Sequence, residues 1–241
     1  MLFSGIDSII TAVYIFAKKP FRCSKKHAIL TLFQGIELIL KAKLYEVNEL
    51  LIYSNIDKEL KDDSSTVGIK EIKIRLRNLG LDLEKDEEEK LNKIQSRRNK
   101  IQHHFYDEDL NDLVIIGEGL EFANDFLSLH FKKSLEELVS EEDYRVIHEV
   151  MDEFGRTVRL AEEKASAAIA PKSKDDLLSN DVLIYCPECW KKTLILFSGT
   201  SGTCFFCNAK FTDVELCHRC NSQILHDPPP FYCYDCLNQI D

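Results

Sequence analysis

Apolar residues recur at intervals of three and four along the first two thirds of the chain. Two such runs are Phe3, Ile6, Ile10 and Val13, and Ile29, Leu32, Phe33, Ile36 and Leu40. Similar stripes follow over residues 69–79, 113–127 and 144–158. This spacing gathers apolar side chains on one face of an amphipathic α-helix. The pattern predicts five or six substantial helices between residues 2 and 168, packed as an all-α bundle.

Prolines and turn residues divide the chain into parts. Pro20 is the only proline before Pro171, and so long an interval suits a helical domain because proline breaks helices. After residue 168 the sequence becomes polar, and β-type residues and turn signals then take over. We therefore predict a helical domain over residues 1–168, a linker over 169–182 and a small β-rich module over 183–241.

The C-terminal module carries four Cys-x-x-Cys pairs. They are Cys186/Cys189, Cys204/Cys207, Cys217/Cys220 and Cys233/Cys236. Two cysteines at this spacing can reach one ion, and four thiolates complete a tetrahedral zinc site. The pattern predicts two structural Zn²⁺ ions, with no position left for a catalytic water. The favoured pairing is sequential, first pair with second and third with fourth; an interleaved cross-brace and an iron–sulfur cluster are the alternatives.

The first zinc site is expected to be a zinc ribbon. A strand is predicted from Thr193 to Phe197, and a turn over residues 198–202 leads into the next cysteine knuckle. Cys23 lies far from these pairs and is interpreted as a small buried hydrophobe.

Charge and hydropathy limit the partners. The formal net charge is −10, and the C-terminal module has more acidic than basic residues, so general phosphate binding by the module is disfavoured. Its aromatic residues suit a tiny core or a protein-docking surface. The longest apolar run of the first helix, residues 9–17, is too short to span a bilayer, and no secretory signal is visible. We expect a cytoplasmic protein with reduced cysteines and no membrane association.

One segment of this acidic chain, residues 91–104, is basic and contains no Asp or Glu. Its lysines and arginines are Lys93, Arg97, Arg98 and Lys100. Arg98 takes a slot in an apolar helical stripe that runs from Leu91 to Ile101. A guanidinium in a stripe that faces the core is costly unless it is paired or lines a cleft. The acidic run just before this segment, residues 84–89, is interpreted as a solvated helix start.

Arg98, Asn99 and His103 read R-N-x-x-x-H, which resembles the R-x4-6-H signature of HEPN domains. The apolar stretch from Ala28 to Leu44 is also similar to the second helix of that superfamily. The resemblance covers most of residues 1–165. It implies an all-α, up-and-down bundle whose subunits commonly pair across a positively charged cleft. Active members of the family are metal-independent endoribonucleases.

The resemblance implies roles for the motif residues. His103 would withdraw the proton of the RNA 2′-OH or protonate the leaving 5′-oxygen, because imidazole exchanges protons near neutral pH. Arg98 would neutralise charge on the phosphate, and Asn99 would orient the phosphate or the histidine. The products would be a 2′,3′-cyclic phosphate and a 5′-hydroxyl, and no metal would take part.

The spacing of the motif leaves alternatives open. Five residues of helix rotate by about 140°, so Arg98 and His103 do not share a face of one straight helix. Either the helix loosens near His103, or the site combines residues from two subunits. His104 is an alternative to His103, and Arg97 is an alternative to Arg98. Lys100 is a supporting basic residue.

Glu37 is a second anomaly, because it is a carboxylate within an apolar helical stretch. Its partner is either Lys41, one turn later, or Arg98, whose guanidinium it would aim.

These features together predict an RNA-cleaving HEPN protein, a homodimer with a composite active site. By resemblance, its role would lie in a toxin–antitoxin or antiphage system. The zinc module would regulate the enzyme or dock a protein partner. The alternative function is a non-catalytic HEPN and zinc-ribbon module for dimerisation and protein interaction.

Overall fold

The structure is a computed structural model, and it describes eleven stretches of the chain. These are residues 1–18, 24–57, 59–61, 64–103, 112–169, 181–186, 189, 191–197, 201–212, 215–216 and 223–224. The chain divides into two compact units, Met1–Phe154 and Gly155–Asp241. Each unit is described by itself.

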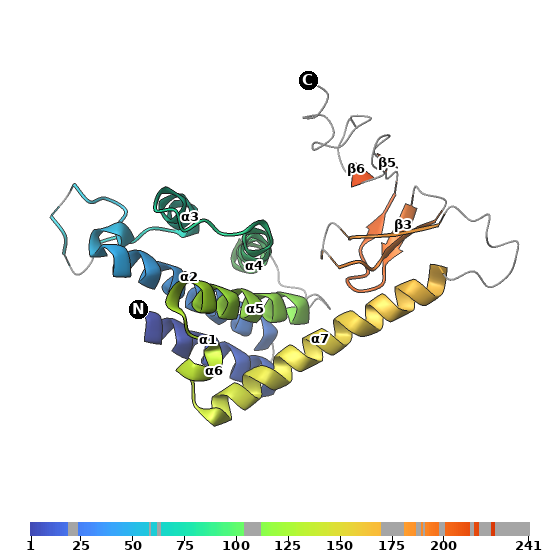
Figure 1. The fold of residues 1–241 in the computed structure, drawn as a ribbon, viewed down its shortest axis with the longest axis horizontal. Coiled ribbons are helices and arrows are strands. Elements are labelled where there is room, and N and C mark those ends of the chain that lie inside the picture. The colour runs from blue at the N-terminus through green and yellow to red at the C-terminus, as the bar shows by residue number, and fades with distance from the viewer. Residues whose placement is uncertain are drawn as a thin grey trace, which may run out of the picture. The chain divides into compact units, whose positions relative to one another are not determined.

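The first unit is helical and is organised around α2 (Figure 1). Its helices are α1 (Leu2–Lys18), α2 (Ser24–Val47), α3 (Ile69–Asn78), α4 (Lys85–His103), α5 (Asp112–Phe131), the short α6 (Leu135–Leu138) and the first half of α7 (Glu141–Ile169). A 3-10 turn, η1 (Glu49–Ile52), follows α2. α2 contacts α1, α3, α4 and α5. Its apolar stripe, which includes Leu32, Ile36 and Leu40, is fully buried and forms the centre of the core.

Two glycines bring α1 and α2 unusually close together. A Cβ atom at Gly35 would lie 2.8 Å from the carbonyl oxygen of Gly5 and 2.8 Å from Cγ1 of Ile9. A Cβ at Gly5 would in turn lie 2.9 Å from the carbonyl oxygen of Gly35. Backbone atoms cannot move aside as a flexible side chain can, so both positions require glycine.

We expect Gly35→Ala to lower the free energy of unfolding of the helical unit by about 1–3 kcal/mol, the usual cost of overpacking a core. Urea unfolding followed by circular dichroism measures this loss. Gly155→Ala in α7 is the matched control, because its Cβ would meet only Nη1 of Arg159, at 3.7 Å. In a helix interior this control should stabilise by about 0.5–1 kcal/mol. Equal stability of Gly35→Ala and the wild type would contradict the close helix contact.

The second unit contains a four-stranded antiparallel sheet in the order β1-β2-β3-β4. The strands are β1 (Val182–Ile184), β2 (Leu194–Phe197), β3 (Ser201–Cys204) and β4 (Lys210–Phe211). β2 and β3 form the central hairpin, in which Leu194 pairs with Cys204. A further two-stranded sheet joins β5 (Glu215–Leu216) and β6 (Gln223–Ile224).

The sequence predicted the element types well and one boundary poorly. Six helices of ten or more residues lie in the described chain up to residue 169, and the predicted ribbon hairpin is present. The predicted turn over 198–202 is too long, because Ser201 and Gly202 belong to β3. A Cβ at Gly202 would lie 1.8 Å from the carbonyl oxygen of Ile195, so only glycine allows the strands to pair there.

The structure confirms the predicted fold class as helices followed by a small antiparallel sheet. The HEPN assignment stays a prediction. In Figure 1, α3 and α4 are seen nearly end-on, whereas α2 lies in the plane of the view, so they cross α2. No helix in the described stretches is both long enough and apolar enough to span a bilayer.

Candidate active-site groove and metal centre

Helix α4 carries every described residue of the R-N-x-x-x-H motif. It begins with Asp86, Glu87 and Glu88 in its first turn and ends with Lys100 and His103 in its last turn. Acidic residues near the N-terminus and basic residues near the C-terminus interact favourably with the helix dipole and so stabilise the helix. The helix continues without a break through His103. The predicted loosening of the helix therefore does not occur before that residue.

The acidic start of α4 is solvated at Glu84 and Asp86, as the sequence predicts, but not at Glu87. Glu87 is 7% exposed, and its Oε2 accepts a hydrogen bond of 2.8 Å from the backbone N–H of Glu84. Burial raises the pKa of this carboxyl. The solvated interpretation was wrong for Glu87 because its side chain caps the helix start while it packs inward.

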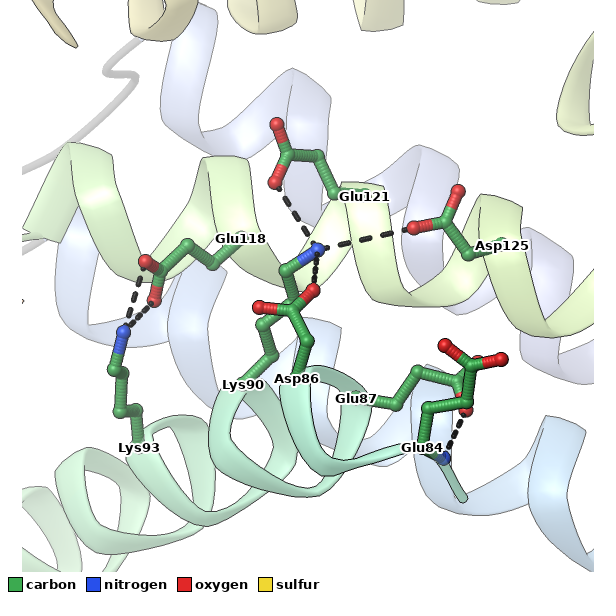
Figure 2. Close-up of polar contacts among 8 residues, drawn as sticks. All are labelled: Glu84, Asp86, Glu87, Lys90, Lys93, Glu118, Glu121 and Asp125. Atoms are coloured by element: carbon green, nitrogen blue, oxygen red, sulfur yellow. Dashed lines mark hydrogen bonds and ion pairs between the residues drawn. The ribbon is translucent and has the colours of Figure 1, made fainter. Parts of the chain in front are cut away.

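Lys90 of α4 lies among three carboxylates (Figure 2). Its Nζ lies 2.8 Å from Asp86 Oδ2, 3.4 Å from Glu121 Oε2 and 3.8 Å from Asp125 Oδ2. Burial by itself would lower the pKa of Lys90, but the hydrogen bond to Asp86 and the nearby carboxylates raise it. Glu121 and Asp125 belong to α5, so this lysine ties α4 to α5.

Two further basic residues of α4 bind buried acids of α5. Lys93 Nζ lies 3.0 Å from both carboxylate oxygens of Glu118, as Figure 2 shows. Arg97 donates from Nε at 3.0 Å and from Nη2 at 2.7 Å to Oδ1 of Asp112, which is fully buried. Buried carboxylates need such partners. Arg97, the alternative to Arg98 in the sequence motif, is therefore engaged in holding α4 against α5.

Arg98 has a different environment from Arg97. Its guanidinium lies 5.1 Å from the ring centre of Phe33 on α2, a cation–π contact. Its Nη1 donates a hydrogen bond of 2.9 Å to Oδ1 of Asn99. Among the described residues, no carboxylate lies within ion-pair distance of Arg98. Its positive charge is thus available for an anion, in contrast to that of Arg97.

Glu37 binds Lys41, the local partner considered for it in the sequence. Lys41 Nζ lies 2.6 Å from Glu37 Oε1 and donates a second hydrogen bond of 3.0 Å to Thr66 Oγ1. The structure therefore does not pair Glu37 with Arg98. The ion pair gives the Glu37 carboxylate a charged hydrogen-bond donor, which the surrounding apolar residues cannot supply.

A groove of about 360 Å³ runs along one face of α4. Its lining residues are Asn92, Gln95, Ser96, Asn99, Lys100 and His103. None of them is acidic, although the whole chain carries a net charge of −10. Asn99 and His103, one turn apart, both face this groove, whereas Arg98 lies beside it. The angular separation of Arg98 and His103 expected for a straight helix is thus present, and Asn99 both lines the groove and accepts the hydrogen bond of Arg98.

His104 lies outside the described residues, so the structure does not compare it with His103. Cys23 lies outside them as well, and its interpretation as a buried hydrophobe stays a prediction.

The first two cysteine pairs come together in the second unit. Cys186 Sγ lies 3.6 Å from Cys207 Sγ, and Cys189 Sγ lies 3.6 Å from Cys204 Sγ. All four sulfur atoms lie within 4.8 Å of one another and are buried. A tetrahedron with metal–sulfur bonds of about 2.3 Å has edges of about 3.8 Å. The four cysteines can therefore hold one metal ion, joined as sequential pairing predicts.

The predicted second zinc site is not brought together in the part of the chain that the structure describes. All four of its expected ligands lie outside the described residues, and they are Cys217, Cys220, Cys233 and Cys236. The four-cysteine cluster in the described stretches is the one formed by the first two pairs. The structure thus gives the geometry of one candidate metal site, and the second ion stays a prediction from the cysteine spacing.

Hydrogen-bond donors surround the sulfur of Cys204. The backbone N–H groups of Phe206 and Cys207 each donate to it at 3.4 Å, and Thr193 Oγ1 lies 3.1 Å away. Donors of this kind stabilise a thiolate. Asn208, directly after the knuckle, has a positive φ of 59° that closes the turn. Neither the role of Thr193 at the sulfur nor that of Asn208 in the turn was predicted from the sequence; for Asn208, its place directly after Cys-x-x-Cys was the available signal.

Without a metal, these thiols cannot all ionise independently. Hydrogen bonds between sulfurs, foremost with Cys186, lower the pKa of Cys204 and raise the pKa of Cys189 and Cys207. A bound divalent cation would remove this conflict, because each thiol would release its proton to solvent and bind the metal as a thiolate.

Comparison with known proteins identifies no relative of this chain. The chain matches no protein-family model, no curated protein and no solved structure at a significant level. The resemblance to HEPN domains accordingly rests on the motif of α4 and on the apolar stretch of α2.

Proposed function

We propose that this protein is a metal-independent endoribonuclease whose chemistry is carried by Arg98, Asn99 and His103. One observation carries the proposal: among the described residues, Arg98 of α4 has no carboxylate partner, and it lies beside a groove whose described lining contains a histidine and no carboxylate. Such a surface attracts a phosphodiester in a chain that is otherwise acidic. The four-cysteine cluster is proposed to bind a structural zinc ion, because four protein sulfurs leave no position for a reacting water.

RNA supplies its own nucleophile in this mechanism. The 2′-oxygen attacks the adjacent phosphorus as its proton leaves, and the bond from phosphorus to the 5′-oxygen breaks as that oxygen gains a proton. His103 serves as the base or as the acid in this exchange. Arg98 binds the non-bridging phosphate oxygens, on which negative charge grows in the transition state. Asn99 holds the Arg98 guanidinium and leaves its own amide N–H groups for the phosphate.

The separation of Arg98 and His103 around α4 favours a site built from two subunits. In a homodimer, Arg98 of one chain and His103 of the other can face the same phosphate. By resemblance to HEPN proteins, such an enzyme acts in toxin–antitoxin or antiphage defence. The C-terminal module is then suited to regulation or to docking of a protein partner.

The test is cleavage of a single-stranded RNA in EDTA by the full chain. We expect Arg98→Ala to lose about 10²–10³-fold in rate and His103→Ala about 10²–10⁴-fold. Arg77→Ala and His148→Ala are the matched controls, since both side chains are exposed and lie on other helices, and they should cleave like the wild type. A 2′-deoxy nucleotide at the cleaved position should block the reaction.

Two outcomes separate the alternatives. Mixing Arg98→Ala with His103→Ala should restore cleavage, because a mixed dimer contains one intact composite site. Equal residual cleavage in the wild type and both variants would refute the enzyme and leave the non-catalytic interaction module as the function.

A further inference from the structure

The groove on α4 extends well beyond the residues assigned to chemistry. Asn99, Lys100 and His103 line its C-terminal end, and Asn92, Gln95 and Ser96 continue it toward the start of the helix. At about 1.5 Å per residue, the lining from position 92 to position 103 spans about 16 Å. This length exceeds what a single phosphate needs, so the groove has room for a neighbouring part of the ligand.

The extension has a different chemistry from the phosphate end. Asn92, Gln95 and Ser96 carry amide and hydroxyl groups, which donate and accept hydrogen bonds without net charge. In the described part of the chain, the side chains of Gln95 and Ser96 make no hydrogen bond. Uncharged groups of this kind add little to phosphate attraction. They suit the edge of a base, where asparagine and glutamine form paired hydrogen bonds with adenine.

Asn92 is oriented in advance. Lys73 Nζ donates a hydrogen bond of 3.1 Å to Asn92 Oδ1, and the same Nζ lies 2.6 Å from Glu88 Oε1. This hydrogen bond uses one of the two lone pairs of Oδ1, so the Asn92 amide still has one acceptor position and both N–H groups for a ligand. A residue held in this way recognises a partner at a lower entropic cost than a mobile side chain.

We propose that Asn92, Gln95 and Ser96 form a base-reading subsite that selects single-stranded RNA with an adenine within one or two nucleotides of the cleaved phosphate. The inference rests on the proposed ribonuclease function and adds its substrate class. A double-stranded RNA does not fit, because the adenine edge that pairs with asparagine or glutamine lies in its deep, narrow major groove. The volume of about 360 Å³ matches a site for one small ligand group.

The experiment uses a short single-stranded RNA library with randomised positions, in two arms. In the first arm, the full chain cleaves the library and the cut positions are sequenced. In the second arm, the His103→Ala variant binds the library, so base preference is measured without cleavage. We expect the wild type to prefer adenine, and Gln95→Ala or Asn92→Ala to reduce that preference about tenfold. Gln102→Ala is the matched control, because Gln102 is an exposed glutamine of α4 outside the groove.

The two arms distinguish the failure of each proposal. Cleavage that depends on His103 but shows no adenine preference, or the same preference in Gln95→Ala, overturns the subsite and leaves the enzyme. Adenine preference in binding without any cleavage overturns the enzyme and supports the subsite. A shift of Gln95→Ala from dimer to monomer with unchanged base preference overturns the subsite and assigns the groove to a subunit contact.

Discussion

Cys204→Ser is expected to release one zinc ion per chain and to unfold the sheet formed by β1–β4. The strands are two to four residues long, and few apolar side chains are buried there besides Leu194, Ile195 and Leu196. So small a core cannot offset the loss of chain entropy without a metal or disulfides. Structural zinc contributes about 10–16 kcal/mol in small metal-dependent domains, which makes this the largest effect expected in the molecule.

Metal analysis and near-ultraviolet circular dichroism of the full chain test this expectation. The sequence predicts two zinc ions per wild-type chain, so Cys204→Ser should retain one. Cys23→Ser is the matched control, because this cysteine lies outside the Cys-x-x-Cys pairs, and it should retain both. Equal zinc content in Cys204→Ser and the wild type would contradict the four-cysteine site. A strong chelator should reproduce the loss of the sheet in the wild type.

Asp112→Ala is expected to lower the free energy of unfolding of the helical unit by about 3–5 kcal/mol, the usual cost of breaking a buried ion pair. Its carboxylate is fully buried and accepts both hydrogen bonds from Arg97. Removal of Asp112 takes away the buried carboxylate that binds the Arg97 guanidinium between α4 and α5. Because α4 carries Arg98 and His103, the same change should also impair RNA cleavage.

A double substitution separates the contribution of the ion pair to the free energy of unfolding from the contribution of packing. Arg97→Met with Asp112→Leu removes both charges and should recover most of the lost stability, because well-packed apolar residues can replace a buried pair. Arg77→Ala is the control, since its pair with Asp82 is exposed, with side-chain exposures of 64% and 62%. That exposed pair should contribute less than about 1 kcal/mol. Urea unfolding measures all four proteins; a loss in Asp112→Ala no greater than in Arg77→Ala would refute the role of the buried pair.

Local patterns explain why much of the fold was predictable. The helices follow from apolar residues three and four positions apart, as in Ile29, Leu32 and Ile36, and this periodicity acts within a single turn. The pairing of Glu37 with Lys41 is equally local, since residues four apart adjoin on a helix. The knuckle of Cys204 and Cys207 is short enough to be identified from spacing alone.

The sequence by itself determined the helical first unit, the ribbon hairpin and each Cys-x-x-Cys knuckle, because these features depend on neighbours along the chain. It favoured sequential pairing of the knuckles and kept the interleaved cross-brace as the alternative; the tertiary structure joins the first two pairs. The sequence favoured Arg98 and kept Arg97 as an alternative, since adjacent residues of a helix differ only by a rotation of about 100°. The tertiary structure decided between their environments. Packing of α4 against α5 turns Arg97 toward buried Asp112, and the contact of Arg98 with Phe33 leaves its charge beside the groove. Which arginine meets a carboxylate depends on how two helices pack, and no local pattern contains that information.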